Sequence, residues 1–265
     1  MREHPLPPRA SSPLLTAVGG AVVRGVAETG RASIMLAAAL RWMLRGRLEF
    51  RETFVQFNRI GVESVPIGLI TGLFTGMVLA YQTARQFIDF GAQGFVGGLV
   101  GVSMAREAAP VFTAIMASGR VGAGIAAEIG TMAVTEQVDA LRVLATDPVR
   151  YLVVPRLLAA GLALPILTIF ANLIGGAGGY LVATAAGVSS GTFLASVQRF
   201  LEPYDLVAGL VKAFFFGLII AGVGCYRGLH ATGGADGVGR ATTGAVVAAI
   251  VLILVCNFFL DVAFF

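Results

Sequence analysis

The sequence predicts an all-α membrane protein that crosses the bilayer about five times. Hydrophobic residues occupy 57% of the 265 positions and charged residues only 13%, about half the charged share of soluble domains. The 35 glycines agree with this class, because glycine lets membrane helices pack closely. Most charged residues stand at the ends of long apolar stretches, and this spacing predicts where each spanning helix begins and ends.

Residues 1–50 are predicted to lie outside the bilayer core. Residues 1–13 contain several prolines and arginines and predict a disordered tail. Residues 14–50 are apolar but interrupted by charges such as Arg24, Glu28 and Arg31, whose spacing places them on one helical face. We predict an amphipathic helix in the membrane interface, with a soluble amphipathic helix as the alternative. Residues 51–265 then form one transmembrane domain.

The spanning helices are read from uncharged stretches. Ser64–Ala84 has 21 residues without a charge, enough to cross a hydrocarbon core of about 30 Å, and its Pro66 and glycines predict a kink or a local break. Leu157–Gln198 has 42 uncharged residues, too many for one span at about 1.5 Å per residue, so we expect a span, a Gly/Ser-rich turn and a short helix outside the core. The predicted spans are residues 64–84, 90–127, 157–184, 205–226 and 241–262.

The distribution of basic residues predicts the orientation. Nine of the 19 basic residues precede Ser64, three lie at 142–156 and two at 227–240. Because basic residues concentrate in cytoplasmic loops, we expect these segments and the N-terminus in the cytoplasm and the C-terminus on the opposite side. The net charge of +4 is then explained by topology, so no nucleic-acid partner is predicted.

The sequence lacks the motifs of ATP binding and of metal-dependent catalysis. A P-loop needs GxxxxGK[ST], and the only lysine, Lys212, is followed by Ala213. No HExxH or cysteine–histidine pair is present, and Cys225 and Cys256 stand in apolar surroundings. We therefore predict no catalytic residue, no metal ligand and no cofactor on this chain, and ATP-derived energy would enter from another polypeptide.

A short amphipathic segment, TEQVDALRVL, follows the second predicted span. On a helix Val138, Leu141 and Leu144 fall at i, i+3 and i+6 and form a narrow apolar stripe beside charged side chains. Such a helix can dock into a groove on a soluble partner, and an ordinary solvated loop is the alternative.

The same region carries a family resemblance. AAEIGTMAVTEQVDAL at residues 126–141, followed by DPVRYLVVPRLLA, resembles the MlaE/YrbE permeases, the membrane subunits of ABC systems that move lipids. The likeness extends to REAAPVFTAIMASGRVGAG and to GADGVGRATTGAVV, and covers roughly residues 55–262. Two positions depart from the pattern, with Ala133 where arginine is commoner and Ala108 where leucine is usual. The first removes a positive charge beside the amphipathic segment.

The resemblance implies a set of partners and a place in the cell. Such permeases form a homodimer or a pair of related subunits in a bacterial inner membrane, beneath a ring of MCE-domain proteins. Two cytoplasmic ABC ATPase subunits bind ATP and Mg below them, and membrane phospholipid is the default substrate. The segment after the second span then resembles the coupling helix that receives motion from the ATPase. Its candidate residues are Glu128, Glu136, Gln137, Asp139, Leu141 and Arg142.

Ionisable residues inside the predicted spans form a second set of candidates. Arg106, Glu107, Lys212 and Asp261 lie within or at the ends of apolar stretches. A charge at mid-membrane costs about 2.5–3.5 kcal/mol, so we expect them to be paired or to line a wet cavity. They form either a polar zone that meets a lipid headgroup or gates the path, or ion pairs that only hold helices together. Asp261, like Asp205, can also lie at a water interface.

Substrate contact is expected from the first span. Its large apolar residues recur at helical spacing and give a face that can touch a lipid tail, with ordinary helix packing as the alternative. These residues are Leu73, Phe74, Met77, Val78 and Tyr81.

Three functions remain open from the residues. The chain is a lipid-transport subunit driven by an ATPase, an ion-coupled carrier that uses its acids as proton relays, or an intramembrane lipid-modifying enzyme with Glu107 and Asp261 as acid and base. The absence of catalytic motifs and the family resemblance favour the first.

Overall fold

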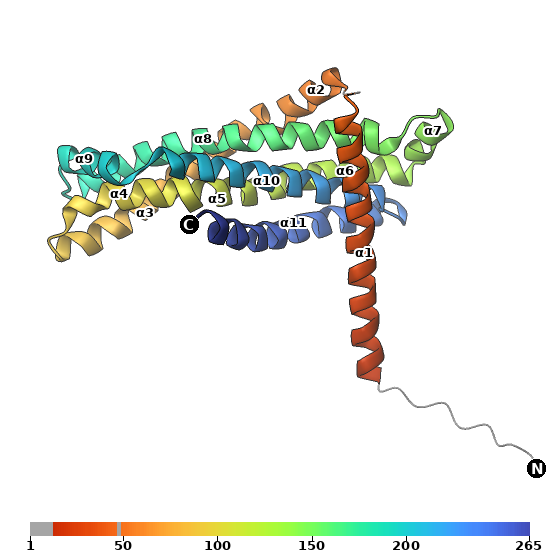
Figure 1. Ribbon diagram of the computed structural model, residues 1–265, viewed down its shortest axis with the longest axis horizontal. Coiled ribbons are helices and arrows are strands. Elements are labelled where there is room, and N and C mark those ends of the chain that lie inside the picture. The colour runs from red at the N-terminus through yellow and green to blue at the C-terminus, as the bar shows by residue number, and fades with distance from the viewer. Residues whose placement is uncertain (1–12, 47–48) are drawn as a thin grey trace, which may run out of the picture.

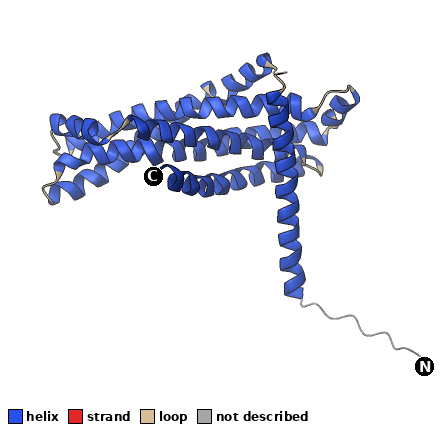
Figure 2. Cartoon of the chain, viewed as in Figure 1, coloured by secondary structure: helices blue, strands red, loops and turns tan. Residues whose placement is uncertain are grey.

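The computed structural model describes residues 13–46 and 49–265, and every regular element within these ranges is a helix (Figure 2). The predicted all-α class is confirmed. The predicted disordered tail falls outside the described residues apart from Pro13, which begins the first helix.

Within the described residues, five helical stretches are long and apolar enough to span a membrane, as predicted. They run side by side along the long axis of the molecule (Figure 1). Their bounds are Phe50–Asp89, Gln93–Val134, Val149–Ala185, Pro203–Leu229 and Gly234–Phe264. The α-helices within them are α2 (Phe50–Ile60), α3 (Val65–Asp89), α4 (Val96–Ser103), α5 (Ala109–Ala117), α6 (Ala123–Val134), α8 (Val154–Ala185), α10 (Pro203–Leu229) and α11 (Gly234–Phe264).

Helix α3 packs against α8 through glycines. The predicted local break is wrong, because α3 is continuous and Pro66 lies in its first turn, where its missing N–H is not needed. The glycines serve close approach instead. A Cβ placed on Gly76 would lie 2.0 Å from the carbonyl oxygen of Gly175, and one on Gly72 would lie 2.8 Å from Cα of Ala171. Small residues at such crossings let the two backbones touch, which is how membrane helices gain contact energy.

The second span is interrupted by two π-helical turns, Met104–Ala108 and Ser118–Gly122. Each widens the helix locally, and turns of this kind are frequent at functional sites. The first carries Arg106 and Glu107, and the second carries Arg120. The span also continues to Val134 and the third begins at Val149, so their connection is shorter than the residues 128–156 that the predicted spans leave between them.

Helix α1, Pro13–Leu44, lies across one end of the bundle at a steep angle to the spans (Figure 1). Met35 and Ala39 on it are buried, and the indole N–H of Trp42 donates a hydrogen bond to Asp147 at 2.8 Å. The helix ends before residue 50, and α2 begins there as the first part of the first span. The predicted segment 14–50 therefore holds one long helix and a connection.

Two short helices cap the bundle. Helix α7, Gln137–Val143, lies between the second and third spans at the same end as α1, where the sequence predicts the amphipathic helix. Helix α9, Ser190–Phe200, lies at the other end after the long α8 and matches the predicted short helix. Ser189 begins α9 by accepting a hydrogen bond from the Thr192 N–H at 3.2 Å. Helix α11 ends part-way along the bundle (Figure 1).

Candidate functional site

Lys212 is the centre of a charged cluster inside the bundle. Its side chain on α10 is fully buried, and its ammonium donates to the carboxylates of Glu107 and Asp261. A third hydrogen bond, 3.0 Å long, goes to the backbone carbonyl of Arg106. All three N–H groups of the ammonium therefore have acceptors, which is what makes a buried lysine tolerable.

Asn257 joins the two carboxylates from the other side. Its side-chain amide donates to Glu107 at 2.8 Å and to Asp261 at 3.2 Å, one turn further along α11. One cation and one amide thus hold two acids that would repel each other if left alone.

A second ion pair adjoins this cluster. The guanidinium of Arg106 contacts Asp205 at 2.7 Å and lies 4.0 Å from the ring centre of Phe265. Asp205 is buried and also accepts from the Glu202 N–H at 3.0 Å, which caps the start of α10. Counting Arg106, Lys212 and the three acids, the zone carries one net negative charge.

The cluster is covered on one side only. The side chain of Lys212 has no exposed surface, whereas those of Glu107 and Asp261 are 43% and 31% exposed. The carboxylates thus face outward from this chain at a depth where lipid would not solvate them. A stable arrangement needs that face to line a wet cavity or to be covered by another molecule.

The structure pairs the predicted membrane charges, as expected, but with partners that the sequence does not show. Arg106 and Glu107 are adjacent in sequence, yet each pairs with a residue about 100 positions away because the π turn and the helix direct them to different neighbours. The suggested water-interface position is wrong for Asp205, which is buried. The sequence analysis did not predict Asn257 as part of this cluster. Its spacing of four residues from Asp261, which places both on one face of a helix, is the signal that could have found it.

A separate network ties the spans together near α1 and α7. Glu128 accepts from Arg59 of α2 at 3.0 Å and from Arg156 of α8 at 3.1 Å. Arg120 donates to Glu63 at 2.9 Å and to the Ser64 hydroxyl at 2.6 Å. Glu128, predicted as a coupling residue, therefore clamps three helices at the base of the segment that leads to α7.

Helix α7 presents the remaining coupling candidates on its surface. Glu136 precedes it in a left-handed conformation with φ of 61°, and Gln137 begins it and donates to the Thr135 hydroxyl at 3.0 Å. Asp139 and Arg142 pair at 2.6 Å with both side chains more than 60% exposed, so their charges are available to a partner.

The predicted apolar stripe of α7 is buried at one end and exposed at the other. Val138 is buried and Leu141 packs partly against the core, whereas Leu144 is 73% exposed. Its neighbour Val143 is 86% exposed and was not among the predicted residues. The inner part of the stripe holds α7 on the bundle, and the exposed tip is left for contact outside the chain.

Of the five candidate lipid-contacting residues of α3, two pack against α8 and three are exposed. Leu73 and Met77 point toward α8, where a Cβ on Gly178 would meet them at 2.7 and 3.0 Å. The other three, Phe74, Val78 and Tyr81, are between 49% and 59% exposed. The two groups lie about 100° apart on the helix, so only the second can meet a lipid tail without rearrangement.

Comparison with known proteins places these features in a family. The model of the family Permease MlaE matches residues 53–263. The chain belongs to this family. It is 50% identical over 220 residues to a probable ABC transporter permease protein of a Synechocystis strain, covering 83% of this chain and 84% of that one.

Two other relatives carry more specific names. The chain is 37% identical over 253 residues to the intermembrane phospholipid transport system permease protein MlaE of Haemophilus influenzae, covering 95% of this chain and 97% of that protein. It is 41% identical over 224 residues to the chloroplastic protein TRIGALACTOSYLDIACYLGLYCEROL 1 of Arabidopsis thaliana, covering 84% of this chain and 64% of that protein.

The family makes this chain a multi-pass permease subunit of an ABC transporter and not an enzyme, with the ATPase on a separate chain. The prediction drawn from the missing P-loop is thereby confirmed, and the carboxylates of Glu107 and Asp261 need not serve as a catalytic acid and base.

Proposed function

We propose that this chain is the membrane subunit of a phospholipid transporter that works between the two membranes of a bacterial envelope. The permease carries the lipid path, and two ATPase subunits that bind ATP and Mg drive it from the cytoplasm. The proposal is supported by the relative named for intermembrane phospholipid transport, which matches over nearly the whole chain. The Lys212 cluster, open on one face, carries the proposal structurally.

The open face of the cluster supports a dimer. Exposed carboxylates at membrane depth are costly unless water or protein meets them. A second copy of this chain that covers Glu107 and Asp261 across a wet cavity would satisfy them and would place an ammonium and two acids beside a lipid headgroup. The exposed face of α3 with Phe74, Val78 and Tyr81 would then offer an apolar wall to the acyl chains. A ring of MCE-domain proteins would receive the lipid on the outer side.

Helix α7 is proposed as the coupling element. Its charged pair Asp139–Arg142 and its apolar tip protrude from the bundle, so that an ATPase groove can bind both. Glu128 binds α2 and α8 at the base of this segment, and a push on α7 would be passed to those helices.

Reconstitution tests the function directly. Liposomes that contain the permease with its ATPase and MCE-domain partners should transfer fluorescent phospholipid when ATP is added, and liposomes with the permease alone should not. ATP-independent transfer driven by a proton gradient would favour the ion-coupled carrier and refute the proposal.

Orientation is a separate part of the proposal. We place the N-terminus, α7 and the α10–α11 connection in the cytoplasm of a cell with an inner membrane, and the α8–α9 connection in the periplasm. A cysteine at Ser190 should react with an impermeant maleimide in intact cells whose outer membrane is permeabilised. A cysteine at the exposed Leu144 should react only after the inner membrane is opened. The reverse pattern would invert the topology.

A further inference from the structure

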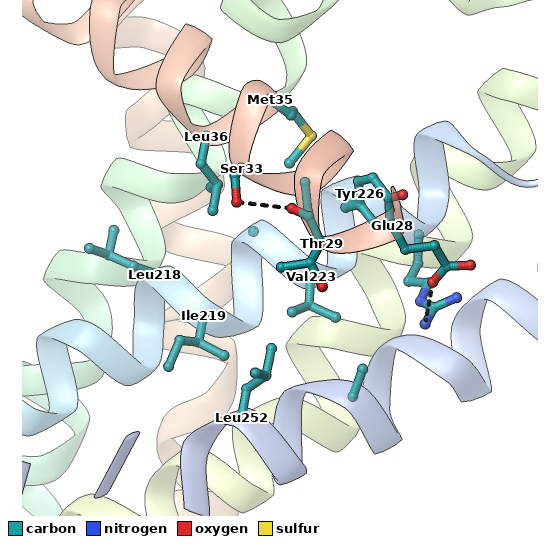
Figure 3. Close-up of a pocket in the computed structure, with 14 residues that line it drawn as sticks. Glu28, Thr29, Ser33, Met35, Leu36, Leu218, Ile219, Val223, Tyr226 and Leu252 are labelled. Carbon is teal, nitrogen blue, oxygen red and sulfur yellow. Dashed lines mark hydrogen bonds and ion pairs between the residues drawn. The ribbon is translucent and has the colours of Figure 1, made fainter. Parts of the chain in front are cut away.

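Helices α1, α10 and α11 enclose an apolar groove of about 290 Å³ (Figure 3). Its wall is formed by Met35 and Leu36 of α1, Leu218 and Ile219 of α10, and Leu252 of α11. Helix α1 crosses the two spans here without filling the space between them. The groove is therefore open to whatever surrounds the bundle at this depth.

The groove continues into a polar cavity of about 370 Å³. The two share Glu28, Tyr226 and Arg227, and the second adds Arg31, His230 and Arg240. Arg227 contacts Glu28 at 3.5 Å, which neutralises one of the three arginines. Among the described residues, Arg31 and Arg240 form no ion pair, so the cavity has a surplus of two positive charges.

The histidine adds a further donor or acceptor to this cavity. The Nδ1 atom of His230 lies 2.8 Å from the carbonyl oxygen of Tyr226, and the two rings are 4.4 Å apart. Since the carbonyl can only accept, the proton belongs on Nδ1. The Nε2 atom has no hydrogen-bond partner within the described residues.

The polarity changes along the groove in the same order as through one bilayer leaflet. From Leu218 to His230 helix α10 rises about 18 Å and its groove-facing residues pass from apolar to basic. One leaflet of hydrocarbon is about 15 Å deep, followed by the phosphates. The basic end lies beside the α10–α11 connection, at the end of the bundle where α1 crosses.

We propose that this composite groove binds an anionic phospholipid from the leaflet on the α1 side. One acyl chain lies in the apolar part, and the phosphate contacts Arg31 and Arg240. The lipid joins α1 to α10 and α11 and so fixes the angle at which α1 crosses the bundle. This site is distinct from the Lys212 cluster, because Lys212 and Arg227 are about 22 Å apart along α10. It does not depend on the proposed transport function.

Photolabelling of the full-length chain in phosphatidylcholine nanodiscs tests the site. The probe is phosphatidylglycerol with a diazirine in one acyl chain, and labelled peptides are identified by mass spectrometry. Labels are expected on α1, α10 and α11 residues of the groove. Excess phosphatidylglycerol should remove them, whereas phosphatidylcholine and glycerol 3-phosphate should not. Equal competition by phosphatidylcholine, or competition by glycerol 3-phosphate, would refute an anionic lipid held by both its ends.

Two variants separate the headgroup from the acyl chain. The double variant R31Q/R240Q should weaken phosphatidylglycerol binding about 30-fold. Ala248→Phe should fill the apolar part from α11 and reduce acyl-chain labelling while the arginines remain. The control R85Q/R199Q changes the charge equally at exposed positions of the opposite end, and its labelling should equal wild type.

The result would overturn the proposal if R31Q/R240Q and Ala248→Phe, both monodisperse and thermally stable, label like wild type. The proposal would also be overturned if the isolated chain is labelled but the chain bound to its partner proteins is not. The groove would then be the binding site for a membrane helix of a partner.

Discussion

Replacing Lys212 by methionine removes the only cation that contacts Glu107 and Asp261 in the described part of the chain. Methionine keeps a similar length and can occupy the buried position of Lys212, so the change isolates the charge. Breaking a buried ion pair by deleting one partner costs about 3–5 kcal/mol, because the remaining charge is left unpaired. The side chains of Glu107 and Asp261 are 43% and 31% exposed. This exposure reduces the loss of stability, because solvent screens their unpaired charges. We therefore expect a loss of about 3 kcal/mol, at the lower end of that range.

The coupling between Lys212 and Glu107 provides a sharper measurement than the single variant. The free energy of unfolding is measured in mixed micelles by titration with sodium dodecyl sulfate for wild type, K212M, E107Q and the double variant. Because E107Q removes one of the two carboxylates that K212M leaves without a cation, the double variant should be more stable than the sum of the single losses predicts, by at least about 1 kcal/mol. A coupling energy below about 0.3 kcal/mol would show that the two side chains act independently and would refute the paired geometry.

The same variant reports on function. If the ammonium meets a lipid headgroup or gates the path, K212M should reduce ATP-dependent phospholipid transfer in reconstituted liposomes even where its amount in the membrane is normal. Normal transfer by K212M would assign Lys212 to helix packing alone.

Two further predictions concern the ends and the centre of the bundle. Charge reversal at Glu136 and Asp139 should lower the yield of ATPase in pull-downs of folded permease several-fold, because both carboxylates face away from the bundle. The control Asp89→Lys, at the opposite end of the bundle, should leave the yield unchanged. An unchanged yield for the charge-reversed variant would contradict the coupling role of α7. Gly76→Ala should destabilise the protein by about 1–3 kcal/mol, because the new methyl group would meet the backbone of α8. The control Gly176→Ala should have little effect, because its methyl group would enter open space. Equal thermal unfolding of the two variants would show that α3 and α8 do not touch here.

The spans and the two short helices, α7 and α9, could be predicted from the sequence because each depends on local pattern. An uncharged run of 21 residues has few alternatives to a membrane helix. The ends of these elements were less well predicted. Glu128 interrupts the uncharged run in the sequence, yet α6 continues past it to Val134, and Arg59 and Arg156 both pair with its half-exposed carboxylate.

The composition and charge spacing by themselves determined that this chain is a helical membrane protein, and its motifs pointed to a permease that depends on a separate ATPase. The tertiary structure alone decided which charge meets which. Lys212 lies 105 residues from Glu107 and 49 from Asp261, and no periodicity joins positions so far apart. Hydrophobic pattern acts along one helix, whereas ion pairing depends on how helices cross, and the crossings here are set by glycine contacts such as that of Gly76 with α8.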